Sequence, residues 1–243
     1  MEMLAMMIGF DPMYFVFVGP AILLAMWAQA KVKWAYATGS KYAARCGLTG
    51  AQTAQRILNA YGITDVAIEP VNSFLGDHYD PKHKKLRLSP DVYGGRSLSA
   101  LGIAAHEVGH AIQDATAYAP LAIRNGLVPM AAVGGHLSML LIMAGVVMTA
   151  MIGSGLGTWV AIAGLGLFGV TVVFQLVNLP VEFNASSRAR AVLLDQGLVT
   201  MDEDRVVAKV LSAAAMTYVA ATITAVMTML YYAWILFGNR RSN

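Results

Sequence analysis

Two histidines and a glutamate stand within five residues, His106, Glu107 and His110, in the mostly apolar stretch AAHEVGHAIQ. On an α-helix, side chains four positions apart lie on one face, one turn from each other. The two imidazoles could therefore bind one cation, at about 2.0–2.1 Å each for zinc. Glu107 is rotated by about 100° from that line, so it could reach a metal-bound water without being a ligand. This His-Glu-x-x-His spacing predicts two zinc ligands and a general base.

A catalytic zinc ion takes a third protein ligand and keeps a fourth position open. Position 116 is Thr116, which excludes the longer motif with a third histidine six residues after His110. Glu182 is the favoured third ligand, because a carboxylate directly after a long apolar run needs a partner and a metal supplies one. Asn178 and Pro180 predict that a helix begins just before Glu182, with Asn178 as its cap.

Two other residues compete for the third position. Asp114 lies one turn further along the face of the histidines, but it is too close in sequence to close a tetrahedron easily, so a second-shell role or a solvated helix end suits it better. His136 lies inside an apolar stretch, where packing or hydrogen bonding is the favoured role. The alternative for His106 and His110 is that both are buried and satisfied by backbone carbonyl groups.

The composition indicates a membrane protein. The chain is 57% hydrophobic and 13% charged, whereas soluble domains carry roughly 25% charged residues. A net charge of +3 without basic runs argues against nucleic acid as a partner. The single cysteine, Cys46, excludes an intrachain disulfide and a cysteine-based zinc site. The first fifteen residues contain no Lys or Arg, so we expect no cleaved signal peptide.

Three apolar stretches are long enough to cross a bilayer, and one of them is long enough to cross twice. No Asp, Glu, Lys or Arg stands between Arg124 and Glu182. One spanning helix needs about 20 residues, so this run holds two, divided at the glycine-rich segment 152–159. The expected transmembrane helices cover residues 13–33, 128–151, 158–178 and 211–237.

The remaining polar segments, 34–127 and 179–210, are expected to form one small domain on a single face of the membrane. Within it we expect a helix at 47–63, a strand at 66–71, a hairpin in 76–90 and the histidine helix at 97–115. His78 and His83 flank the hairpin turn and are expected to be exposed, while the hairpin's edge strand could align an extended peptide. The fold class is thus mainly α with a small β-hairpin or sheet.

The flanking charges predict the orientation of the domain. No Lys or Arg precedes the first expected span, whereas Lys31, Lys33, Lys41 and Arg45 follow it. Cytoplasmic loops carry an excess of Lys and Arg, so the polar domain is predicted to be cytoplasmic. Four further basic residues agree: Arg188, Arg190, Arg205 and Lys209. Two basic residues near the C-terminus disagree, Arg240 and Arg241.

Three strings in the chain resemble a known family: HYDPKHKKLRLSPDVYGGRSLSALGIAAHEVGHAIQ, YAPLAIRNGLVP and LPVEFNASSRA. They are similar to the membrane-bound neutral zinc metallopeptidases of the YugP-like family. The resemblance covers most of the chain and implies a gluzincin-type peptidase with the layout of the HtpX membrane proteases. It matches His106 and His110 to the family's ligand histidines, Glu107 to its catalytic glutamate and Glu182 to its third ligand.

One position departs from the HtpX pattern. There, an aspartate four residues after the ligand glutamate orients a ligand histidine, whereas this chain has Ser186. Asn184 or Ser186 could take that role. Arg188 is a candidate stabiliser of the reaction's oxyanion, with a surface or lipid-headgroup charge as an equal alternative, and Tyr118 and Tyr79 are weaker candidates.

We therefore expect a multi-pass protein, in a bacterial cell membrane, that hydrolyses peptide bonds of membrane or membrane-proximal proteins. One Zn²⁺ per chain would activate a water molecule whose proton Glu107 accepts. The expected partners are a protein or peptide substrate and the lipid bilayer, with a membrane-protein partner or a homo-oligomer left open. The alternative functions are a membrane zinc-binding scaffold or transport protein and a gated pseudo-protease that acts through binding.

Overall fold

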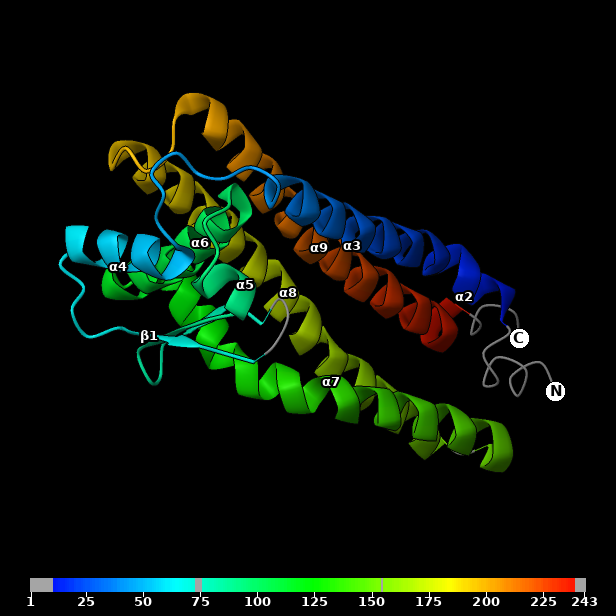
Figure 1. Ribbon diagram of the computed structural model, residues 1–243. Coiled ribbons are helices and arrows are strands. Elements are labelled where there is room, and N and C mark those ends of the chain that lie inside the picture. Colours follow the sequence, from blue (N-terminus) through cyan, green and yellow to red (C-terminus); the bar gives the residue numbers. More distant parts are fainter. Residues whose placement is uncertain (1–10, 73–75, 154, 239–243) are drawn as a thin grey trace. The chain divides into compact units, whose positions relative to one another are not determined.

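The computed structural model describes residues 11–72, 76–153 and 155–238. The chain has two compact units, and Figure 1 shows its helices and strands coloured in sequence order. Unit 1 takes in 1–27, 123–178 and 218–243, and unit 2 takes in 28–122 and 179–217. The expectation about a signal peptide concerns residues that lie mostly outside the described part of the chain.

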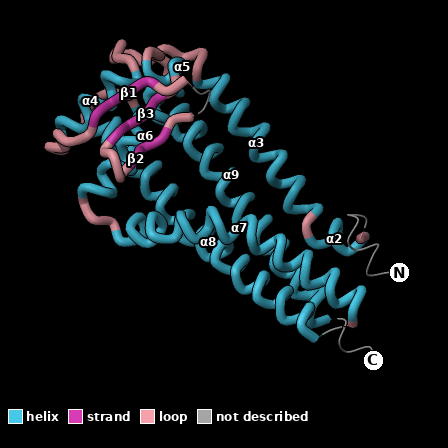
Figure 2. The backbone as a smooth tube through the Cα atoms, turned by 90° about the horizontal axis from the view of Figure 1, so that it is seen from below, coloured by secondary structure: helices cyan, strands magenta, loops and turns pink. Residues whose placement is uncertain are grey.

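A three-stranded sheet in unit 2 has the order β1-β3-β2 (Figure 2). Strands β2 (His78–Asp80) and β3 (Lys85–Leu88) form the expected hairpin, and β1 (Ala67–Pro70) pairs with β3 in parallel. In β3, Leu86 and Leu88 are buried while Lys85 and Arg87 are half-buried, so the alternation in the sequence does mark the two faces. Both strand predictions are confirmed.

Helix α4 (Gly50–Ala60) lies where the sequence predicts it. Thr49 and Gln52 cap each other's backbone N–H groups at its start. The chain turns away at Gly62, whose φ of +66° is one that glycine adopts without strain. Helix α5 (Pro90–Tyr93) is a single turn.

Helix α6 (Leu98–Ala115) is the expected histidine helix, and Ser97 caps it by accepting a hydrogen bond from the amide of Ala100 at 3.2 Å. It packs against α4, α5 and the sheet. Its core-facing side chains recur at helical spacing and include Leu101, Ala104, Val108 and Ile112. Because this face anchors α6 in the core, His106 and His110 are held at its margin, half-buried.

Three long helices follow: α7 (Ala119–Ile152), α8 (Gly155–Asp195) and α9 (Met201–Ala233), which ends in the π-helical turn η1 (Trp234–Gly238). Among the described residues, these are the three helices long and apolar enough to cross a membrane. In unit 1, α7 and α8 touch through small residues. A β-carbon at Gly164 would lie 2.7 Å from the amide nitrogen of Ile142, so glycine permits this contact.

The prediction of four spans is wrong by one. The segment 13–33 does not form a single helix: α2 (Pro12–Phe17) ends at Val18, and α3 (Gly19–Gly39) begins after it. Because of this break, the apolar residues before Val18 belong to α2 and not to α3. Helix α3 extends further along the chain than expected and includes the charged residues Lys31 and Lys33. Helix α3 is therefore not among the described helices that meet the length and hydropathy of a membrane span.

The predicted helix start at Asn178 is also wrong, because α8 runs without interruption through Pro180. A proline within a helix removes one intrahelical hydrogen bond, and membrane helices tolerate this loss. Asn178 instead accepts a hydrogen bond from Nε of Arg124 at 3.2 Å. Helix α7 likewise continues through Pro129 rather than beginning near 128.

Candidate metal centre

The two histidines of α6 lie one turn apart with their rings close together. The ring centroids of His106 and His110 are 4.8 Å apart, and the ring planes are nearly perpendicular at 84°. Their side chains are 14% and 12% exposed, so most of each imidazole ring is covered by the protein.

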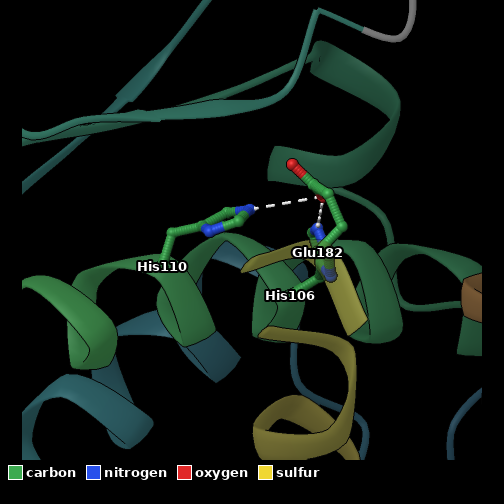
Figure 3. A group of neighbouring side chains, drawn as sticks. All are labelled: His106, His110 and Glu182. Carbon is green, nitrogen blue, oxygen red and sulfur yellow. Dashed lines mark ion pairs between the residues drawn. The ribbon is translucent and has the colours of Figure 1, made fainter. Parts of the chain in front are cut away.

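Helix α8 brings Glu182 to both rings. Its Oε2 lies 3.3 Å from Nε2 of His106 and 3.7 Å from Nε2 of His110 (Figure 3). Gly109 permits this approach, because a β-carbon there would lie 2.6 Å from the carbonyl oxygen of Ala185, one turn beyond Glu182. The sequence prediction that Glu182 meets the two histidines agrees with this geometry.

The three side chains have the chemistry and spacing of a cation site. Each offers one ligand atom, and the three atoms lie within 4.8 Å of one another. If zinc had four ligands in tetrahedral positions at about 2.0–2.1 Å each, the ligand atoms would be about 3.3–3.4 Å apart. Glu182 is only 3% exposed, and its Oε2 has no hydrogen bond of good geometry. Because a buried carboxylate oxygen needs a partner, a cation between these three groups fits the site.

The electrostatics of the cluster keep Glu182 ionised. Burial alone would raise the pKa of Glu182, but the nearby imidazoles of His106 and His110 outweigh burial and hold the pKa well below its usual range. Burial alone would lower the pKa of His110, but Glu182 and Glu107 raise it. The negative charge therefore remains on Glu182 at neutral pH, as a metal ligand requires.

The second nitrogen of each histidine is held by a polar side chain. Nδ1 of His106 lies 3.1 Å from Oγ of Ser186, one of the two residues considered for this role. Nδ1 of His110 lies 3.0 Å from Oε1 of Gln113. Because the amide oxygen of Gln113 can only accept, the proton of this bond is on Nδ1 of His110, and Nε2 is the nitrogen that faces Glu182.

Sequence reasoning missed Gln113. Its side chain is fully buried, and Nε2 donates to the carbonyl of Val181 at 2.8 Å and to Oδ1 of Asn184 at 3.0 Å. Gln113 thus joins His110 to the turn of α8 that carries Glu182. The available signal was its position three residues after His110, on the same face of the helix.

Arg188 extends the same network. Its Nε donates to Oδ1 of Asn184 at 2.7 Å, and its guanidinium lies over the ring of Tyr118, 5.9 Å from the centroid. Asn184 is therefore shared between Gln113 and Arg188. The ring of Tyr118 therefore faces the guanidinium group of Arg188.

Glu107 is buried against the edge of the sheet. Its Oε2 accepts a hydrogen bond from the backbone amide of Tyr79 in β2 at 3.0 Å. Because Glu107 is adjacent to His106, this contact fixes a carboxylate beside the three-residue cluster. The hairpin and the histidine helix are thus tied together at the residue expected to act as the base.

Asp114 contacts the hairpin and not the ligand cluster, in agreement with the preference for Glu182 as the third ligand. Its Oδ2 accepts hydrogen bonds from the hydroxyl of Tyr79 at 2.8 Å and from Nζ of Lys84 at 2.7 Å. Burial and the bond to Asp114 raise the pKa of Tyr79, so the hydroxyl stays protonated and donates. Asp114 therefore fastens the hairpin to α6 and is not among the clustered ligand atoms.

The other histidines do not join the described ligand cluster. His136 is exposed, with Nδ1 3.3 Å from the carbonyl of Ala132, in agreement with the hydrogen-bonding role that was one of the two favoured for it. His78 and His83 are exposed beside the hairpin turn, as predicted, and His83 pairs with Asp80 at 2.8 Å. Cys46 is partly buried and free.

Comparison with known proteins identifies the family. Residues 14–237 match the family model Zn_peptidase_2, described as "Putative neutral zinc metallopeptidase". The chain belongs to this zinc metallopeptidase family. It is also 43% identical over 232 residues to the "Putative membrane protease YugP" of Bacillus subtilis (strain 168), covering 95% of this chain and 100% of that protein. No solved structure matches.

Membership of the zinc metallopeptidase family agrees with the structure in two respects. The family name implies zinc, and His106, His110 and Glu182 form a donor set of the kind that binds catalytic zinc. The relative is named a membrane protease, and three described helices of this chain could span a membrane.

Proposed function

We propose that this protein is an integral-membrane zinc metalloendopeptidase that hydrolyses peptide bonds of membrane or membrane-proximal proteins. His106, His110 and Glu182 hold one Zn²⁺, in a gluzincin-like arrangement, and Glu107 is the general base. The observation that carries the proposal is the approach of Oε2 of Glu182 to both histidines, with Glu107 adjacent on the same helix.

When bound, zinc supplies a Lewis acid that acidifies a water molecule and polarises the scissile carbonyl. Glu107 accepts the proton of the attacking water and returns it to the leaving amine. The amide of Tyr79 holds one carboxylate oxygen of Glu107, Oε2, and so orients the other, Oε1, for this transfer. The burial of Glu107, 8% exposed, limits competition from bulk water.

Arg188 is proposed to stabilise the oxyanion of the tetrahedral intermediate. Asn184 and Tyr118 hold its guanidinium, which lowers the entropy lost when it binds the developing charge. The hydroxyl of Tyr79 is already donated to Asp114, so it is the weaker candidate.

The location of the site follows from the charges around the spans. Helices α7, α8 and α9 are proposed to anchor the chain in the cell membrane of a bacterium, with unit 2 on the cytoplasmic side. Substrates are then proteins whose cleavable segments lie in or near the bilayer surface.

The experiment is cleavage of an unfolded model protein by the detergent-purified full chain, beside Glu107→Gln, with zinc measured in both. The proposal expects equal zinc in the two proteins and cleavage by the unmutated chain alone. His136→Ala, which changes an exposed histidine outside the cluster, should cleave at the unmutated rate. If both chains bind zinc and neither cleaves the model protein, the proposed peptidase activity is contradicted. The zinc-binding scaffold or the gated pseudo-protease is then favoured.

A further inference from the structure

A groove of about 480 Å³ lies in unit 2, where the end of α3 meets the start of α6. Its size falls within the range of about 300–1,000 Å³ typical of small-ligand sites. It shares no residue with the metal cluster or with Glu107. The lining residues are Tyr36, Ser40, Lys41, Ala43, Asp91, Gly95, Arg96 and Ser97.

Three charged side chains line this groove, and none forms an ion pair with another residue in the described part of the chain. They are Lys41, Arg96 and Asp91. By contrast, Lys84 and Arg190 in the same unit each pair with a carboxylate, at 2.7 and 2.6 Å. Two cations beside one concave surface attract an anion with several oxygen acceptors, and phosphate has that character.

The ends of two helices add partial charges of both signs. Ser97 is the N-cap of α6, so the positive end of that helix begins at the groove. The C-terminal end of α3, just before Ser40, and the carboxylate of Asp91 supply negative charge. The groove is therefore complementary to a ligand that has both a phosphate and a hydrogen-bond donor.

The surroundings favour a lipid as the source of that phosphate. Along α3, apolar residues give way to Lys31, Lys33 and Trp34, and Tyr42 follows the helix. Trp34 is 69% exposed and Tyr42 52% exposed. Basic and large aromatic residues gather where membrane proteins meet lipid headgroups.

We propose that this groove binds the headgroup of a phospholipid that carries a hydrogen-bond donor, such as an ethanolamine or glycerol group. Lys41 and Arg96 bind the phosphate, and Asp91 accepts from the ammonium or hydroxyl group. A choline headgroup, which has no donor, binds more weakly. The proposal does not depend on peptidase activity.

The test is native mass spectrometry of the full chain in detergent, titrated with short-chain phosphatidylglycerol, phosphatidylethanolamine or phosphatidylcholine, or with inorganic phosphate. We expect the first two lipids to bind about tenfold or more tightly than the last two. In the double variant Lys41→Gln/Arg96→Gln this binding falls by about tenfold or more. Asp91→Ala, which leaves no acceptor at this position, removes the preference for donor-bearing headgroups.

The matched control is Arg56→Gln/Lys82→Gln, which removes two exposed charges elsewhere in unit 2 and should bind lipid normally. All variants are compared by thermal unfolding, so that loss of binding is scored only in a folded chain. Equal binding of phosphatidylcholine by the unmutated chain, or an equal loss in the control, overturns the proposal. Inorganic phosphate binding as tightly as lipid overturns the assignment to lipid.

Discussion

Gly109 lies against Ala185 so closely that a β-carbon at Gly109 would be 2.6 Å from the carbonyl oxygen of Ala185. Because the obstacle is backbone, it cannot move without moving α8. This contact sets the distance at which α8 passes α6, and therefore the reach of Glu182 to the two histidines. A single missing side chain thus helps to determine the geometry of the candidate metal centre.

Gly109→Ala should separate Glu182 from His106 and His110. We expect zinc affinity to fall by about tenfold or more and cleavage by about 100-fold, since displacements near 1 Å have such effects. Competition with a chelator of known affinity measures the first effect. Gly102→Ala is the control on the same helix, where the three atoms nearest to the new β-carbon belong to the side chain of Val207, the closest at 3.0 Å, and not to the backbone of α8. Similar zinc losses in both variants would contradict this account.

Gln113→Leu should weaken zinc binding without removing a ligand. The substitution leaves Nδ1 of His110 without its acceptor and the carbonyl of Val181 without its donor from Gln113, whereas Asn184 keeps its bond from Arg188. Loss of such supporting contacts commonly lowers metal affinity by about 10- to 100-fold. Gln55→Leu, on the exposed face of α4, is the matched control. Unchanged zinc affinity in Gln113→Leu would show that Gln113 does not position His110.

Tyr79→Phe should loosen the hairpin while sparing the metal centre. It removes the hydroxyl that Tyr79 donates to Asp114 but keeps the amide that Glu107 accepts. We expect a loss of about 0.5–1.5 kcal/mol in the free energy of unfolding, with zinc content unchanged. Denaturant unfolding and elemental analysis measure the two quantities. A loss of zinc would mean that the hydroxyl supports the site itself.

Acid should weaken unit 2 through Glu203. Burial alone would raise the pKa of Glu203, but the amides of Thr200 and Arg45, each 2.8 Å from a carboxylate oxygen, outweigh burial and lower it. A lowered pKa stabilises the fold above the ordinary value of 4.5, and this stability is lost as the pH falls through the folded-state pKa. The stability gap between the unmutated chain and Glu203→Gln should therefore be full at neutral pH and shrink below pH 4.5.

Thermal unfolding of both chains between pH 7 and pH 3 measures this gap. Asp202→Asn, at an exposed neighbouring position, should show no comparable gap at neutral pH. A gap between the unmutated chain and Glu203→Gln that stayed constant with pH would contradict the assignment to Glu203.

Local patterns predicted the short elements of unit 2 well. The capping residues Thr49 and Ser97 and the alternation around Leu86 each specify an element through contacts made within a few residues. His106, Glu107 and His110 were predictable for the same reason, because their relation depends only on helical period. Glu182 was predicted as the third ligand because it is a charged residue at the end of a long apolar run, and no local spacing relates it to the histidines.

The remaining features depend on contacts between distant segments. Pro180 was expected to begin a helix, yet a proline within a long helix leaves the same local pattern. Gln113 acquires its role only when α8 brings Val181 and Asn184 beside it. The break at Val18 is different, because the Gly19-Pro20 dipeptide that follows it is a local signal of a helix boundary.

The most direct test of the metal centre is the zinc content of the purified chain beside that of Glu182→Gln. Glu203→Gln is the control, because Glu203 is also buried in unit 2 but lies outside the ligand cluster. We predict one zinc per chain in the unmutated protein and in Glu203→Gln, and loss of most zinc in Glu182→Gln. Full zinc content in Glu182→Gln would contradict the claim that α8 supplies the third ligand.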